Sequence, residues 1–127
     1  MEVAEMRKDE ALHAFFNSFG IPFYTATSVP EDTVFPWGTY EAIFDDWGGE
    51  PVGITVNLWY RTSSEKIPND KAFEIEKAIG KGGKTIRCDE GIIWIKKGTP
   101  FCQNLSDETD AVIKRRYINV TAEFLTI

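Results

Sequence analysis

The chain has 127 residues, of which 43% are hydrophobic and 13% aromatic. This length fits one domain spanning residues 1–127, and the composition is far from that of a disordered chain. The net charge of −6 repels nucleic acid phosphates, so direct recognition of DNA or RNA is not expected.

Three features bear on location. Cys88 and Cys102 lack a metal-binding or redox spacing, so we interpret them as reduced thiols of an intracellular protein, and their pairing stays open. The charged segment Met1–Glu10 lacks the apolar core of a secretion signal. No apolar run approaches the roughly 18 residues of a membrane-spanning helix. We therefore expect a protein without contact with a membrane.

The N-terminal third predicts a helix and two strands. The helix has Asp9 as a candidate N-cap and ends near Phe19, before Gly20. Its apolar face is formed by Leu12, Phe15, Phe16 and Phe19. Phe23–Ala26 is a candidate short strand, Ser28–Pro36 a polar loop, and a second strand lies within Gly38–Phe44.

Pro51–Tyr60 is the clearest strand, because apolar and polar residues alternate along it. Its core positions are Val52, Ile54, Val56, Leu58 and Tyr60. If Asp45–Gly49 forms a tight turn, this strand pairs antiparallel with Gly38–Phe44.

The second half predicts a polar loop that ends at Glu65 and then a helix with Pro68 and Asn69 near its start, which ends at Gly80. Its inward positions are Ala72, Ile75 and Ile79. Lys84–Asp89 and Ile92–Lys96 predict a hairpin. Because Ile92–Ile95 is apolar on both faces, it is either a central strand or a strand that meets another subunit. Gly98–Asp110 is expected to be a loop. Ala111–Ile127 predicts a final strand whose core side carries Val112, Ile118, Val120, Ala122 and Phe124.

This order of elements predicts an α+β fold. We expect a mostly antiparallel, mixed β-sheet with two helices packed on one of its faces.

The segment Gly80–Thr85 ends in Gly-Lys-Thr, like a phosphate-binding P-loop. The glycine that this motif requires five positions before Gly83 is replaced by Ala78. A P-loop also follows a strand and opens a helix, whereas these glycines close a helix and precede a strand. The segment is therefore interpreted as a helix cap and turn.

The other residues that could take part in catalysis lack the second group that such chemistry needs. His13 is the only histidine, so Cys88 or Cys102 as a nucleophile would have only that residue as a base. Asp45 and Asp46 are adjacent at a strand end, and their side chains point to opposite sides.

The acidic group formed by Asp107, Glu108 and Asp110 lacks the pattern of a calcium loop. We interpret it as a solvated loop or a charged contact surface. We therefore predict no catalytic, cofactor-binding or metal-binding residues and no cofactor.

Two groups of side chains indicate contacts instead. The basic run Lys114–Arg116 lies on a strand and suits ion pairs with the acidic surplus. The aromatic residues Trp37, Tyr40, Trp47 and Trp59 are many for a small domain. Trp59, on the polar face of its strand, either packs under a helix or marks a protein contact.

Several segments resemble the tail completion, or tail terminator, proteins of long-tailed bacteriophages. Val29–Tyr40 resembles the proline loop that leads into a strand in this family. Val56–Thr62 resembles a later strand of the family, which precedes a helix. Gly98–Phe101 and Arg115–Val120 are similar too. The likeness covers nearly the whole chain, although its motifs are loose, and Trp37-Gly38 departs from the family's frequent Pro-Tyr.

The resemblance implies a structural virion protein without enzymatic activity or cofactor. Such proteins form a homo-oligomeric ring, commonly a hexamer, which caps the tail tube and ends its growth. They contact the tail tube protein and the head–tail connector, in the tail or neck of the virion after assembly in the host cytoplasm. Another head–tail joining protein and a small ligand-binding α+β domain remain the alternatives.

Overall fold

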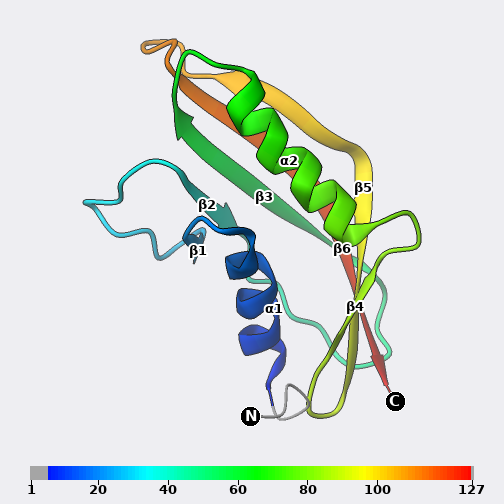
Figure 1. Ribbon diagram of the computed structural model, residues 1–127. Coiled ribbons are helices and arrows are strands. Elements are labelled where there is room, and N and C mark those ends of the chain that lie inside the picture. Colours follow the sequence, from blue (N-terminus) through cyan, green and yellow to red (C-terminus); the bar gives the residue numbers. More distant parts are fainter. Residues whose placement is uncertain (1–5, 127) are drawn as a thin grey trace.

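The computed structural model describes residues 6–126, and one six-stranded mixed sheet contains all of its strands (Figure 1). The strand order is β1-β2-β3-β6-β5-β4, in which only β1 and β2 are parallel. The elements in chain order are α1 (Lys8–Phe16), the 3₁₀ turn η2 (Asn17–Phe19), β1 (Phe23–Thr25), β2 (Trp37–Tyr40), β3 (Val52–Arg61), α2 (Lys66–Ile79), β4 (Lys84–Arg87), β5 (Gly91–Ser106) and β6 (Ile113–Thr126). The predicted α+β fold is confirmed.

The two central strands, β3 and β6, pair antiparallel from Val52 opposite Ala122 to Arg61 opposite Ile113. Alternate residues of both strands point to one face, as their sequence pattern predicts. On that face lie the fully or almost fully buried Ile54, Val56, Leu58, Tyr60, Ile118, Val120, Ala122 and Phe124. The pairing of β2 with β3 is also antiparallel, as predicted.

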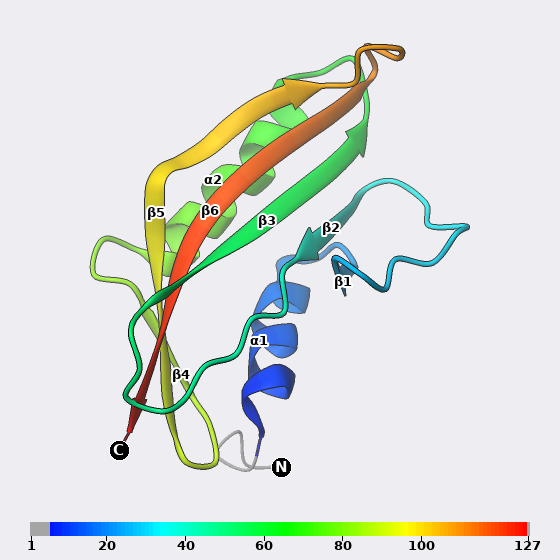
Figure 2. The same ribbon diagram turned by 180° about the vertical axis from the view of Figure 1, so that it is seen from behind.

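Both helices lie on this apolar face of the sheet (Figures 1 and 2). α2 contacts β3, β5 and β6 and buries Ala72, Ile75 and Ile79, the three predicted inward positions. α1 contacts β1 and β4, which are the two edge strands, so the curled sheet brings both of its edges toward the same helix. Phe16 of α1 stacks on Phe23 and Tyr40 and is fully buried.

Several predicted boundaries were wrong. α1 begins at Lys8 with Arg7 as its N-cap, because Glu10 accepts a hydrogen bond from the Arg7 backbone N–H at 2.9 Å. The start of α2, by contrast, is as predicted: the helix begins at Lys66, directly after the loop that ends at Glu65. Pro68 lies in its first turn, where the N–H that proline lacks would have no intrahelical partner. β2 ends at Tyr40, and the residues up to 51 form a longer connection instead of a tight turn.

The largest correction concerns Gly98–Asp110, which was predicted to be a loop. β5 continues through this segment to Ser106 and pairs with β6 as far as Lys114, so the two strands form a long hairpin (Figure 1). Lys97 pairs with Val120, but the next pair is Cys102 with Ile118, so β5 carries a bulge between them. The final strand accordingly begins at Ile113 instead of Ala111, and Ile127 lies outside the described residues.

Candidate functional site

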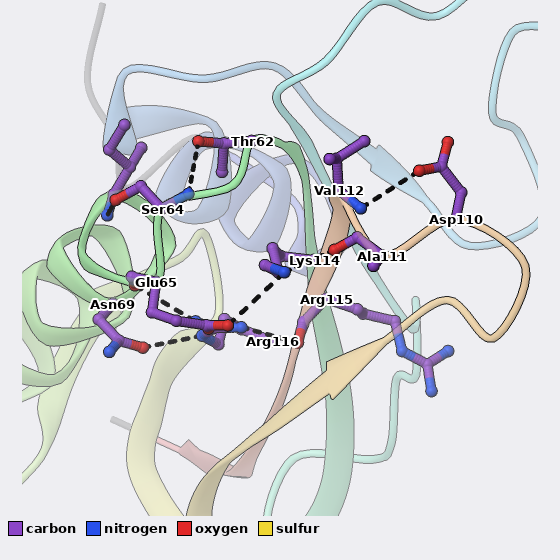
Figure 3. A network of polar contacts seen from close by, with 11 residues as sticks. Thr62, Ser64, Glu65, Asn69, Asp110, Ala111, Val112, Lys114, Arg115 and Arg116 are labelled. Atoms are coloured by element: carbon purple, nitrogen blue, oxygen red, sulfur yellow. Dashed lines mark hydrogen bonds and ion pairs between the residues drawn. The ribbon is translucent and has the colours of Figure 1, made fainter.

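Arg116 of β6 is fully buried beneath the start of α2 (Figure 3). Its Nη2 donates to Glu65 Oε1 at 2.7 Å, and its Nε donates to Asn69 Oδ1 at 2.8 Å. The same guanidinium also donates to the backbone carbonyls of Glu65 and Arg115, at 3.3 Å each. A buried guanidinium requires such partners, because an unpaired charge in the interior is costly.

Lys114, the second basic core-side residue of β6, approaches Glu65 Oε2 at 3.6 Å. The hydrogen bond from Arg116 lowers the pKa of the Glu65 carboxyl below its usual value, and the positive charges of Arg116 and Lys114 lower it further. The prediction of ion pairs for the run Lys114–Arg116 is therefore confirmed at Lys114 and Arg116. These pairs tie the β3–α2 connection to the hairpin of β5 and β6.

The tip of this hairpin carries the predicted acidic group. Asp107 Oδ1 accepts hydrogen bonds from the Thr109 N–H and hydroxyl at 2.8 and 2.7 Å, which lower the pKa of Asp107. Asp110 accepts from the Val112 N–H and pairs with Arg61 at 3.0 Å. Asp107 and Glu108 are exposed, so the tip keeps a negative surface.

The outer edge of β5 is unpaired along the hairpin. β4 pairs only with Ile92–Ile95, and β6 occupies the other edge. Within residues 6–126, no strand pairs with the outer edge of Phe101–Ser106, which we call the open edge. Phe73 of α2 is 64% exposed beside it. A groove of about 380 Å³ is lined by Asn69, Ala72, Phe73, Glu76, Phe101, Cys102 and Asn104.

The face of the sheet opposite the helices carries an aromatic cluster. Trp37 and Trp59 stack at 5.3 Å between ring centroids, and the Arg115 guanidinium lies 5.2 Å from the Trp59 ring. Of the two alternatives for Trp59, packing under a helix is the wrong one, because both helices cover the other face of the sheet. Trp59 Nε1 and Asn57 Oδ1 are buried atoms without a hydrogen-bond partner in the described part of the chain.

Gly80–Thr85 has the geometry of a helix cap and turn. Gly80 and Gly83 have φ of 74° and 88°, the left-handed region that glycine favours, and they connect α2 to β4. Gly82 O accepts a hydrogen bond from Trp94 Nε1 at 2.9 Å. The order of helix, turn and strand is the reverse of a P-loop, as the sequence indicates.

The remaining candidates lie apart from one another in the fold. His13 is exposed on α1, and its Nδ1 lies 3.3 Å from the Tyr40 hydroxyl. Burial raises the pKa of Tyr40. Asp45 Oδ1 accepts a hydrogen bond from the N–H of the adjacent Asp46, whereas the backbone carbonyl of Asp46 accepts one from the Gly49 N–H and closes the local turn.

Both cysteines are free thiols, and they lie in different parts of the sheet. Cys88 is fully buried just after β4, whereas Cys102 is half-buried beside the open edge. Burial raises the pKa of each thiol. Within residues 6–126, no group of three or more histidine, cysteine or acidic side chains is arranged to hold a metal ion. The described helices are all too short or too polar to cross a membrane.

Sequence reasoning missed the two features that dominate this end of the molecule, the buried Arg116 and the open edge. The burial of Arg116 could have been predicted from the alternation of the strand, because Arg116 lies on the same side of β6 as the buried Ile118 and Val120. Comparisons with family models, curated proteins and solved structures gave no match for this chain.

Proposed function

We propose that this chain is a non-enzymatic structural subunit of a ring that terminates the tail tube of a long-tailed bacteriophage. In this role it resides at the head-proximal end of the tail, where it caps the tube, ends its polymerisation and contacts the head–tail connector. Copies of the chain assemble in the host cytoplasm around the tube end.

The open edge is the observation that carries the proposal. An unpaired strand edge presents a row of N–H and C=O groups, which are a template for pairing with another chain. Natural monomers usually protect such edges, whereas assembly subunits use them. Here the edge belongs to the sheet's longest strand and lies next to the exposed Phe73, so it offers both hydrogen bonds and apolar surface.

The likeness of Val29–Tyr40 and Arg115–Val120 to tail terminator proteins supports the same role. The fold gives these segments compatible positions, because Trp37–Tyr40 forms β2 and Arg115–Val120 lies within the central strand β6. A subunit that binds through sheet edges needs a rigid sheet. The ion pair of Arg116 with Glu65 provides rigidity close to the tip of the hairpin, where Arg116 lies opposite Asn104.

A tube-length assay tests the proposal. The tail tube protein from the same genome is allowed to polymerise with and without this chain, and tube lengths are measured by electron microscopy. We expect shorter tubes with a ring of density at one end. Light scattering in the presence of tube is expected to give the mass of a ring of several copies of this chain. Unchanged tube lengths and no density on the tubes would contradict the proposal, and binding to the connector alone would favour the head–tail joining alternative.

A further inference from the structure

A further free edge of the sheet, on the same side of β5 as the open edge, belongs to β4. This strand pairs with β5 on one side, and its other edge faces α1. Across residues 6–126, no backbone hydrogen bond reaches Lys84–Arg87 from that side. A groove of about 360 Å³ lies between α1 and β4, and its apolar lining includes Ala14, Phe15 and Ile86.

The β4 edge and the open edge of β5 carry opposite charge. The segment Lys77–Cys88, which contains β4, has the basic residues Lys77, Lys81, Lys84 and Arg87 and no acidic residue. None of these four forms an ion pair with another residue of the described part of the chain. The segment Gly98–Ile113, which contains the open edge, has three acidic residues and no basic residue. Each edge therefore lacks the charges that the other provides.

The β4 edge and the open edge of one copy cannot pair with each other, because β4 and the hairpin tip lie at opposite ends of the sheet (Figures 1 and 2). The edges are alike in kind: each is a short strand edge beside an apolar groove on the helix side of the sheet. Pairing them between copies would continue the sheet and cover Phe73 in one groove and Phe15 in the other. A contact between two different surfaces of the same chain is head-to-tail and generates a closed ring when its rotation closes.

We propose that copies of this chain join head to tail by strand addition, with the β4 edge of one copy paired to the open edge of the next. The partner of each surface is a second copy of this chain, and the inference rests on the proposed function as a ring subunit. Lys84 and Arg87 then face Asp107 and Glu108 of the neighbouring copy. Main-chain hydrogen bonds provide the affinity, and the charges set the register and exclude pairing between like edges.

A charge exchange tests this contact. The full chain carries Lys84→Glu/Arg87→Glu in one variant, Asp107→Lys/Glu108→Lys in a second and all four changes in a third. Each double variant is expected to weaken self-association about tenfold or more, measured by sedimentation, and the fourfold variant is expected to restore it. The control Glu31→Lys/Asp32→Lys makes the same change in net charge as the second variant on the exposed β1–β2 loop, and it should leave association unchanged. Circular dichroism verifies that each variant folds.

Cross-linking gives an independent readout. A mixture of ¹⁴N- and ¹⁵N-labelled chains is treated with a carbodiimide, which joins amines to carboxylates in direct contact. We expect mixed-isotope peptides that link Lys84 or Lys81 to Asp107 or Glu108. If the wild type assembles but the charge variants associate normally and no such peptide forms, the contact is refuted while the ring function stands. Both the contact and the ring function are contradicted if the wild type stays monomeric with and without tubes and also fails to shorten the tubes.

Discussion

Arg116 has no solvent exposure, whereas the Glu65 side chain, whose carboxylate accepts its Nη2 hydrogen bond at 2.7 Å, is 58% exposed. The pair thus joins a charge that water cannot reach to one that water reaches easily. Removal of the two partners should therefore have unequal effects. A buried cation without its partner is destabilising, but an exposed carboxylate without its partner is simply hydrated.

Arg116→Ala is expected to lower the free energy of unfolding by about 3 kcal/mol, because it removes a buried ion pair and leaves a cavity. Arg116→Met should cost clearly less, since methionine fills much of the same volume and Glu65 remains solvated. Urea denaturation of both variants measures the difference. Equal losses in the two would show that the charge, and not the volume, dominates at this position.

The Glu65 pair also predicts a dependence of stability on pH. The pKa of Glu65 is lowered in the folded state, so its contribution is fully present above the pKa of an unfolded glutamate. That contribution is lost as the pH falls through the lower folded value. Glu65→Gln should therefore be less stable than the wild type at neutral pH, and the gap should close in acid. Denaturant titrations between neutral pH and pH of about 3 measure the gap, and a gap independent of pH would contradict this account.

Two tryptophans on the outer face form a matched pair for a third prediction. Trp94 Nε1 donates to Gly82 O at 2.9 Å, whereas Trp59 Nε1 is buried without a partner. Trp94→Phe should cost about 1 kcal/mol for the lost hydrogen bond, beyond the smaller ring. Trp59→Phe breaks no hydrogen bond of the indole N–H and keeps an aromatic ring beside Trp37 and Arg115, so it should be the milder change. Thermal unfolding of both variants compares them, and a larger loss at Trp59 would imply an acceptor for its indole N–H.

Two adjacent glycines give a fourth prediction. A Cβ at Gly83 would lie 2.5 Å from Trp94 Nε1 and 2.7 Å from Ile95 O, and the residue has a φ of 88°. Gly83→Ala is therefore expected to cost at least about 1–2 kcal/mol from the left-handed backbone alone. At Gly82 a Cβ would meet nothing within 4 Å, so Gly82→Ala should be nearly neutral. Denaturation midpoints measure both, and equal effects would contradict the assigned turn geometry.

The sequence predicts the elements whose side chains meet a continuous core. β3 and the Ile118–Phe124 part of β6 alternate strictly, since one face packs under the helices and the other does not. The same reasoning fails along β5 beyond Gly98. Core-side positions there are Cys102 and Asn104, which line a groove instead of the core, so no apolar alternation marks the strand.

The candidate site was harder to predict, because its parts are distant in the sequence. Nothing near Arg116 along the chain supplies the carboxylate that allows its burial. Glu65 and Asn69 reach it only when α2 lies across β6. The bulge after Lys97 similarly depends on Gly98, where a Cβ would lie 2.8 Å from that of Asn119 on the neighbouring strand. Local turn signals indicate a loop there, and cross-strand packing makes it a strand.

The position of β6 between β3 and β5 has a consequence for synthesis on the ribosome. β3 pairs with β6 along its full length, although Arg61 and Ile113 are separated by α2 and two further strands. While the chain grows, β3 has only the short strand β2 beside it, and its long edge waits for residues 113–122 to emerge from the exit tunnel. The nascent sheet is therefore incomplete at its centre, not at its margin, until β6 emerges. A chaperone that binds extended apolar segments would find Val52–Tyr60 exposed during that interval.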